Sequence, residues 1–174
     1  AIDHITPQGV VTKDGQLHAL DLLVLATGFY PNMWGVKGIK GITDQTLESV
    51  WQQGTRTYRS ITVPGFPNYF MLIGPNSPIT NLSLIEIADI GVDYAIQCID
   101  AFAAGKWRAL MPKADVTAEF THTLTHSFSD TVWVSGCNSW YLDEDGVPAT
   151  WPWAPAHYRE SLRTVRWEDY DIIQ

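Results

Sequence analysis

The sequence Asp21-Leu22-Leu23-Val24-Leu25-Ala26-Thr27-Gly28 starts with an acid, continues through four bulky aliphatic residues and ends in small ones. An apolar run without polar alternation is typical of a strand buried on both faces, as in a parallel sheet between layers. In open α/β sheets, ligands bind beyond the carboxyl ends of strands, where Ala26, Thr27 and Gly28 would lie. Without a side chain, Gly28 would let a ligand or another backbone approach closely. The simpler alternative is a core strand that ends in a turn.

The composition indicates a globular protein. Of the 174 residues, 45% are hydrophobic and 17% are charged, a balance unlike that of disordered chains. The formal net charge of −8 argues against a broad electrostatic attraction to nucleic acid or to an anionic membrane. The longest apolar segment, 84–104, is interrupted by four acidic residues, which excludes a membrane span. We therefore expect no nucleic-acid or membrane partner.

The cysteines and the start of the chain bear on its cellular context. Cys98 and Cys137 have neither the spacing of a redox pair nor the density of a disulfide scaffold. No charged-then-apolar leader opens the chain, so we expect no signal peptide and free thiols in a reducing cytoplasm. Because the first methionine is Met33, we expect the sequence to be a processed product or a remainder of a longer protein.

Short strands are predicted before the opening stretch. Residues 2–5 and 9–12 are predicted as strands, and 13–16 contain the Asp-Gly pair that is typical of a hairpin turn. Residues 17–20 would return toward the buried strand. This unit is a fragment of a sheet, because so few strands would leave open edges.

A second buried strand is predicted from Tyr69 to Ile73, followed by the loop Gly74-Pro75-Asn76-Ser77-Pro78. The segment before it, 31–54, is rich in glycine and reads as a loop with a short helix over 47–52. Residues 61–63 form a brief strand that Pro64-Gly65 ends. The second buried strand thus repeats the arrangement of the first, an apolar run followed by glycine and a turn.

The clearest helix signal begins at Ser83. Ser83-Leu84-Ile85-Glu86 matches a capping box, apolar residues recur at helical spacing to about Ala104, and Gly105 suits a C-terminal cap. A helix N-terminus that follows a glycine loop at a strand end favours anions. Because every globular helix has such an end, the feature gains meaning only from a ligand.

A second helix is predicted over 113–129, where Val116, Phe120, Leu124 and Phe128 form one apolar stripe. His122 and His126 share the i, i+4 spacing of some metal ligands, but no third ligand is evident, so we expect a solvated helix face and no metal. The tail 132–174 is rich in aromatic residues and proline, and we expect it to be irregular and packed on another layer.

Four blocks of sequence follow one another along the chain. They are Gly9 to Gly15 with Asp21 to Phe29; Phe66-Pro67-Asn68-Tyr69-Phe70 with Gly74-Pro75-Asn76-Ser77-Pro78; the helix from Ser83; and Thr131-Val132-Trp133 with Gly136-Cys137-Asn138-Ser139-Trp140-Tyr141 and Trp151-Pro152. In this order they resemble the C-terminal part of flavin-containing monooxygenases. The last block is most similar to the Baeyer–Villiger branch of these class B flavoprotein monooxygenases. The resemblance covers most of the chain.

The resemblance implies a fold and two cofactors. The fold class would be α/β, the C-terminal part of an incomplete FAD/NAD(P)-binding Rossmann-like fold with a helical, aromatic-rich extension. Residues 1–105 would complete an FAD-binding domain, and 106–174 would pack on it. In that family the complete enzyme binds FAD and NADPH, and its reduced flavin captures O₂ as a peroxyflavin that oxidises a ketone or a heteroatom.

The resemblance also implies positions for individual residues. Cofactor-facing residues would come from two strand ends and a helix start; the remaining candidates would lie on the nicotinamide or substrate side of the flavin. The cofactor-facing set is Ala26, Thr27, Gly28, Gly74, Pro75, Asn76, Ser77, Leu82, Ser83 and Leu84; the other side has Trp133 and Asn138. Amides at the helix start would stabilise negative charge on the reduced flavin.

Departures from the family pattern limit what this chain does alone. It contains no G-x-G-x-x-G pyrophosphate motif, no F-x-G-x-x-x-H-x-x-x-W/D signature, and not the upstream arginine that Baeyer–Villiger enzymes use. We therefore expect no catalytic residue here, and an upstream cofactor-binding portion and a small-molecule substrate as partners. Two alternatives are a non-catalytic interaction module and a fragment of another flavin oxidoreductase, although the latter would need a redox cysteine pair.

Overall fold

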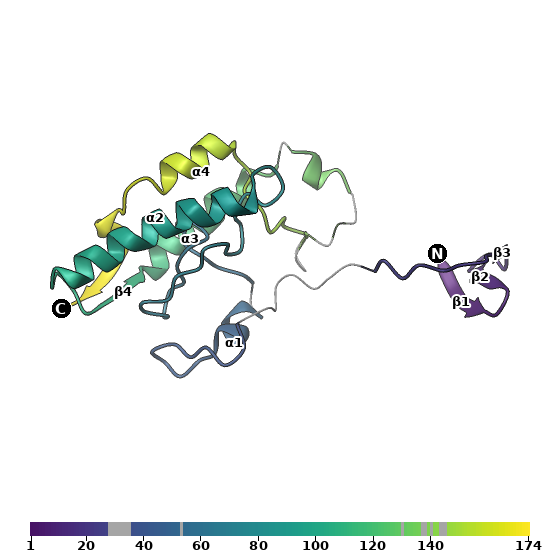
Figure 1. Ribbon diagram of the computed structural model, residues 1–174, viewed down its shortest axis with the longest axis horizontal. Coiled ribbons are helices and arrows are strands. Elements are labelled where there is room, and N and C mark those ends of the chain that lie inside the picture. The colour runs from purple at the N-terminus through teal and green to yellow at the C-terminus, as the bar shows by residue number, and fades with distance from the viewer. Residues whose placement is uncertain (28–35, 53, 130, 137–138, 140, 143–145) are drawn as a thin grey trace. The chain divides into compact units, whose positions relative to one another are not determined.

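The computed structural model describes residues 1–27, 36–52, 54–129, 131–136, 139, 141–142 and 146–174 (Figure 1). The predicted site residues Gly28 and Asn138 lie outside these ranges, as does Cys137. The chain divides into two compact units, Ala1–Pro31 and Asn32–Gln174. Each unit is described by itself below.

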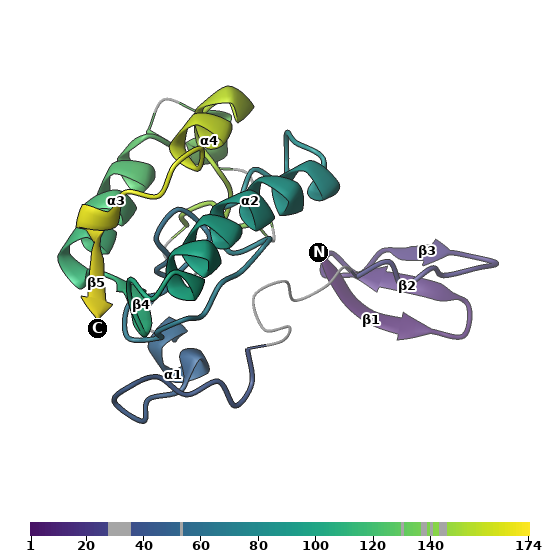
Figure 2. The ribbon, with the colours of Figure 1, turned by 60° about the vertical axis from the view of Figure 1, so that its left-hand side comes forward.

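The first unit is a small antiparallel sheet of three strands in the order β1-β2-β3 (Figure 2). The strands are β1 (Ile2–Thr6), β2 (Gly9–Thr12) and β3 (Leu17–Ala19). Gly15 has a φ of +81° and its amide donates to the Thr12 carbonyl at 2.8 Å, which closes the turn before β3. The predicted hairpin strands and the Asp-Gly turn are therefore confirmed.

The predicted buried strand over 21–25 is wrong for this structure. The segment has no strand assignment, and Leu22, Val24 and Leu25 are 77%, 72% and 73% exposed. The physical reason is the lack of a neighbour: a strand exists only where an adjacent strand accepts and donates its backbone hydrogen bonds. Leu20 is still tied to the Gln8 carbonyl at 3.2 Å, but no described strand pairs with the residues after it.

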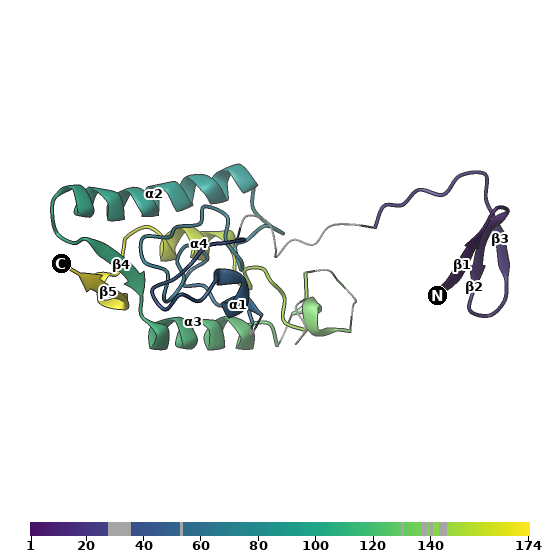
Figure 3. The same ribbon diagram turned by 90° about the horizontal axis from the view of Figure 1, so that it is seen from below.

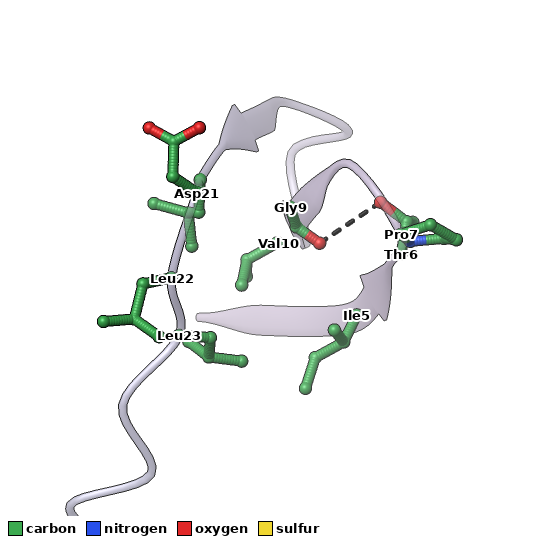
Figure 4. Close-up of a pocket in the computed structure, with 9 residues that line it drawn as sticks. Ile5, Thr6, Pro7, Gly9, Val10, Asp21, Leu22 and Leu23 are labelled. Atoms are coloured by element: carbon green, nitrogen blue, oxygen red, sulfur yellow. Dashed lines mark hydrogen bonds between the residues drawn. The ribbon is translucent and has the colours of Figure 1, made fainter.

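Leu22 and Leu23 instead line a shallow hollow on the first unit (Figure 4). Ile5, Pro7, Val10 and Leu20 contribute its other apolar side chains. The Thr6 hydroxyl donates to the Gly9 carbonyl at 3.2 Å. The hollow is open to solvent, so it leaves much of the aliphatic run uncovered.

The second unit contains most of the helices and a separate two-stranded sheet. In that sheet, β4 (Ala109–Pro112) pairs antiparallel with β5 (Tyr170–Ile173), with Ala109 opposite Ile173. The helical elements are α1 (Leu47–Trp51), α2 (Leu84–Ala103), α3 (Ala114–His126), α4 (Pro155–Ser161) and the 3₁₀ turns η2 (Val132–Val134) and η3 (Trp167–Asp169). The predicted helices over 47–52, 84–104 and 113–129 are confirmed to within a few residues.

Helix α2 ends as its sequence predicts. Gly105 has a φ of +70°, its amide donates to the Phe102 carbonyl at 2.8 Å, and the Lys106 amide donates to the Ala101 carbonyl at 3.0 Å. This pair of bonds is a Schellman motif, which favours glycine at the left-handed position. The C-terminal cap is thus confirmed.

Two other strand predictions are wrong, and so is the expectation that the tail is irregular, although its packing on other elements is confirmed. Residues 61–63 form part of a turn closed by an isolated bridge between Tyr58 and Thr62. Residues 69–73 run without regular structure, and their backbone is taken up by other partners: the Met71 amide donates to the Ile61 carbonyl at 2.8 Å. The tail is more regular than predicted, because it contributes α4 and β5.

The main hydrophobic core of the second unit joins α2, α3, α4, β4 and β5, and a smaller cluster of Val36, Leu47, Val63 and Phe66 lies around α1. The predicted stripe on α3 is confirmed, since Leu124 and Phe128 are buried in the main core and Val116 and Phe120 pack against it. Helices α2 and α3 lie on opposite sides of the unit in Figure 3. Members from both sides of residue 105 include Ile61, Ile87, Tyr94, Leu110, Leu124 and Tyr158. The two-part division at 105 stays a prediction, and the chain's contacts divide it instead at residue 31. Across the described part, no helix has the length and apolar character needed to cross a membrane.

Candidate functional site

The loop from Gly74 to Ser77 is fixed by contacts with the turn at 57–62. A Cβ atom on Gly74 would lie 2.1 Å from the Ser60 carbonyl oxygen, so only glycine fits between the two backbones. The Thr57 hydroxyl donates to the Pro75 carbonyl at 3.2 Å, and the Ser77 hydroxyl donates to the Gly74 carbonyl at 2.6 Å. The loop therefore has a shape set by the chain itself.

Buried Thr150 holds the far side of the same loop. Its hydroxyl lies 3.3 Å from the Ser77 carbonyl, to which it donates, and 3.1 Å from the Thr80 hydroxyl. The Leu82 amide donates to the Pro78 carbonyl at 2.9 Å, which leads the chain into α2. Residues from three distant parts of the sequence thus fix the approach to this helix.

The N-terminus of α2 differs from the predicted capping box. Ser83 has an extended N-cap backbone but makes no side-chain capping hydrogen bond. Glu86 pairs instead with Arg159 of α4, whose Nε lies 2.7 Å from the Glu86 Oε1. The Glu86 carboxylate, which a capping box would direct to the Ser83 amide, instead pairs with a residue from a distant part of the sequence. Because the first amides of a helix have no intrahelical acceptor, this end offers donors beside exposed Ser83 and Leu84.

The predicted site residues fall into separate groups. Gly74 and Ser77 are buried within the loop, Pro75, Asn76 and Leu82 are half-buried, and Ser83 and Leu84 are exposed. Ala26 and Thr27 belong to the first unit and are exposed there. Trp133 is half-buried against the main core, with its ring centroid 5.8 Å from that of Tyr141. The roles of all these residues stay predictions.

Sequence reasoning missed a buried polar network beneath the loop. The Tyr58 hydroxyl donates to the Asp169 carboxylate, while the Tyr170 hydroxyl lies 3.1 Å from that of Thr62 and 2.8 Å from that of Tyr94. Tyr58 and Asp169 are 111 positions apart, so no local spacing signals their contact. The network ties the turn at 57–62 to α2 and β5.

Arginine side chains balance the charge of Asp169. Arg59 Nη2 lies 4.0 Å and Arg166 Nε 3.3 Å from the Asp169 Oδ2. Arg59 also donates to the Ser161 carbonyl and lies over the Tyr58 ring, 5.1 Å from its centroid. A buried carboxylate is stable only with such partners.

Burial keeps the tyrosines of this network protonated. Desolvation is the main cause that raises the pKa of Tyr58, and its hydrogen bond to Asp169 adds to the rise. Desolvation likewise raises the pKa of Tyr94 and raises that of Tyr170 to about 12. At neutral pH these hydroxyls are therefore uncharged hydrogen-bonding groups, and they brace the turn at 57–62.

The histidine pair on α3 forms a ring contact at the surface. The His122 and His126 ring centroids are 4.1 Å apart, and both residues are exposed. Within the described ranges, no group of three or more His, Cys, Asp or Glu side chains is placed to hold a metal ion.

The candidate site consists of the loop 74–77, its supporting turn and the N-terminus of α2.

Curated monooxygenases match almost the whole chain. An uncharacterized monooxygenase of Mycobacterium tuberculosis is 38% identical over 175 residues, which is 98% of this chain and 35% of that protein. An FAD-binding monooxygenase of Dothistroma septosporum is 31% identical over 176 residues, 98% of this chain and 28% of that protein. A Baeyer–Villiger monooxygenase of Streptomyces coelicolor is 31% identical over 169 residues, 95% of this chain and 33% of that protein. The chain thus spans about a third of its curated relatives. No protein-family model matches it.

Solved structures agree with these relatives. The closed crystal structure of cyclohexanone monooxygenase is 26% identical with a TM-score of 0.78, and the match covers 98% of this chain and 34% of that one. An oxidized steroid monooxygenase bound to NADP is 26% identical with a TM-score of 0.79, covering 99% of this chain and 34% of that one. The similarity in sequence and the similarity in structure both extend over nearly every residue of the chain.

Proposed function

We propose that the chain is the C-terminal part of an FAD-binding, Baeyer–Villiger-type monooxygenase, of which it spans about a third. The complete protein uses FAD and NADPH to insert one oxygen atom of O₂ into a ketone or to oxidise a heteroatom. This chain supplies one wall of the flavin site and is inactive alone. The observation that carries the proposal is a match over 98% of the chain that includes an internally fixed loop at the predicted cofactor position.

The loop and helix end have the properties of a cofactor wall. Thr57, Ser60 and Thr150 fix the loop through its backbone, so the site exists before a ligand arrives. Gly74 contributes by letting two backbones meet, and it leaves no open cradle of its own. Of the predicted cofactor-facing residues here, Ser83 and Leu84 are exposed, and Pro75, Asn76 and Leu82 are half-buried. These residues fit one edge of a flat, partly anionic group.

The flavin supplies the reaction with O₂ when it is bound, and NADPH supplies the electrons. The α2 N-terminus directs amide donors toward the cofactor edge, where its positive dipole end favours negative charge. The exposed Leu84 side chain, 54% accessible, would cover part of the apolar ring system and exclude water. The buried network beneath the loop holds these groups in place.

Other parts of the proposed site come from the family pattern. Ala26, Thr27 and Gly28 would lie against the FAD-binding domain near its junction with the NADPH domain, and Trp133 and Asn138 would face the nicotinamide or substrate. Because this chain has no G-x-G-x-x-G motif, the pyrophosphate groups must be bound by upstream residues. Residues 1–105 would then complete a Rossmann-like FAD domain, with 106–174 packed on it.

The alternatives explain less. A disulfide-reductase relative needs a reactive thiol, whereas burial raises the pKa of the Cys98 thiol to about 12. A non-catalytic interaction module would account for the fold but not for a fixed loop at the predicted cofactor position. A cytoplasmic location stays a prediction from the cysteine pattern.

A chimera tests the proposal. This chain replaces the 175 matched residues of the Mycobacterium tuberculosis relative, and the purified chimera is desalted and assayed with NADPH, a panel of ketones and ¹⁸O₂. We expect a yellow protein whose NADPH oxidation rises with ketone and whose ester or lactone product carries one ¹⁸O atom. The unmodified relative and this chain alone are the controls. A folded chimera that retains no flavin would contradict the proposal.

A further inference from the structure

Helix α2 has more apolar surface than the second unit covers. Its buried face is formed by Ile87, Tyr94 and Cys98, which point into the main core. At about 100° per residue, a different set of apolar residues lies on another side of the helix. We name this set the second apolar face: Ile85, Val92, Ile96 and Ile99, which are 83%, 36%, 47% and 53% exposed.

A polar stripe borders the second apolar face. Asp89, Asp93 and Asp100 are exposed and lie between it and the side that meets the tail. On that side, Gln97 donates to the Arg163 carbonyl at 3.2 Å and accepts from the Val165 amide at 3.2 Å. The tail therefore covers the flank beyond the aspartates and leaves the second apolar face open. Figure 3 shows α2 along one edge of its unit.

Such a pattern is unusual for a helix at the surface of a complete domain. A surface helix normally carries one apolar stripe, whereas a helix that is apolar on most sides is covered on most sides. Four exposed branched aliphatic residues in one row are costly to leave in water. The second apolar face is therefore expected to be covered in the working protein.

We infer that the second apolar face of α2 binds the portion of the longer monooxygenase that lies outside this chain. The proposal rests on the proposed function, because it takes the missing occupant from the family. In the relatives, the part outside the match is roughly twice as long as the matched part. The occupant presents an apolar surface whose rim carries Lys or Arg side chains opposite Asp89, Asp93 and Asp100.

Charge argues against a second copy of the chain as the occupant. Each copy has a formal net charge of −8, and a symmetric contact between two α2 helices would bring their aspartate stripes near each other. Like charges at a contact rim slow association and select against the wrong partner. The remainder of the longer protein has no such symmetry constraint.

The test uses two polypeptides. The remainder of the Mycobacterium tuberculosis relative, without its 175 matched residues, is titrated with this chain and binding is followed by analytical ultracentrifugation. We expect a one-to-one complex, and at least a tenfold weaker one when the chain carries Ile96→Lys with Ile99→Lys. The control pair Ala118→Lys with Thr123→Lys makes the same change in charge at exposed positions of α3, on the opposite side of the unit from α2, and should weaken binding less than threefold.

Three results would overturn the inference. The first is a failure of the unmodified chain to bind, and the second is equal binding by the Ile96→Lys, Ile99→Lys variant. The third is a dimer of the chain alone that this variant dissociates while binding to the remainder is unchanged. Circular dichroism of the free variants confirms that each chain is folded. A complex that forms as expected but retains no flavin would leave the interface intact and refute only the proposed function.

Discussion

The loop after Ile73 and the segment after Leu20 have opposite structural outcomes. The sequence predicts a buried strand at 69–73 and another from Asp21, each followed by a glycine and a turn beside a cofactor. The loop 74–77 is fixed by Thr57, Ser60 and Thr150. Residues 21–27 are exposed and form no strand. The loop 74–77 is held by other parts of this chain, whereas residues 21–27 pair with no described strand.

The difference shows what sets a loop in place. A strand needs a neighbouring strand to pair its backbone hydrogen-bonding groups. The apolar run at 22–25 therefore forms no strand by itself. The loop 74–77 instead accepts hydrogen bonds from Thr57 and Thr150, and the network of Tyr58 and Asp169 supports the turn at 57–62. Substitutions in the loop 74–77 and its supporting turn should therefore change the stability of the isolated chain. Substitutions at 22–25 should change stability only in a longer protein.

The largest effect is expected for Asp169→Ala. It leaves Tyr58 without its acceptor and Arg59 without its partner, and the free energy of unfolding should fall by about 3 kcal/mol. Urea denaturation of the isolated chain measures the change. Asp171→Ala, on the exposed side of β5, is the control and should stay within about 0.5 kcal/mol. Equal losses for the two variants would refute the bracing role of the network.

Gly74→Ala should be the next most severe. Its new methyl group would lie 2.1 Å from the Ser60 carbonyl oxygen, and separating the two backbones should cost about 2 kcal/mol. Gly105→Ala is the comparison, because it meets nothing within 4 Å and has only its positive φ to disturb, at about 1 kcal/mol. If Gly74→Ala proved the milder change, the loop would not be fixed as described.

Alkaline pH should lower the stability of the second unit, which contains the buried tyrosine network. The pKa values of Tyr58, Tyr94, Tyr170 and Cys98 are raised by burial, so the folded state holds protons that the unfolded chain releases at ordinary pKa values near 9 to 10. Stability is therefore complete below about pH 9 and falls as pH rises toward 12. Urea midpoints at several pH values, read with tyrosinate absorbance, measure this. A midpoint that stays constant from pH 8 to 11 would contradict it.

The exposed segment 21–27 should tolerate polar substitution. Leu22→Ser and Val24→Ser replace side chains that are 77% and 72% exposed, and each should change the stability of the isolated chain by less than about 0.5 kcal/mol. In the chimera described above, the same changes should cost about 2 kcal/mol or more, as for buried aliphatic residues. A large loss in the isolated chain would show that the run is already packed.

Ser83→Ala should have the smallest effect, below about 0.5 kcal/mol, because the Ser83 side chain makes no capping bond. Thr46→Ala is the matched control: its hydroxyl accepts from the Ser49 amide at 3.2 Å at the start of α1, and the loss should approach 1 kcal/mol. The opposite order would restore the capping box that the sequence predicted.

Local patterns predicted the local elements well. The Asp14-Gly15 turn, the stripe on α3 and the Gly105 cap are each determined by residues within a few positions. The capping box failed because Arg159, 73 residues away, binds Glu86. The strands at 21–25 and 69–73 failed because strand formation depends on neighbours that no local pattern reveals.

The candidate site also contains parts that the sequence predicted and parts that it did not. The order of the four sequence blocks located the loop 74–77 and the start of α2. It did not reveal Thr150, Tyr58 or Asp169, which hold the loop from positions far along the chain. Nor did it predict the second apolar face of α2, because helical spacing alone does not say which apolar side is covered.

Binding of FAD tests the central claim most directly. Flavin fluorescence is titrated first with this chain alone and then with the chain bound to the remainder of the Mycobacterium tuberculosis relative. If the chain is one wall of a shared site, it should bind FAD alone more weakly than about 100 µM, while the complex keeps its flavin through desalting. Micromolar binding by the chain alone, or a stable complex that stays colourless, would contradict the account.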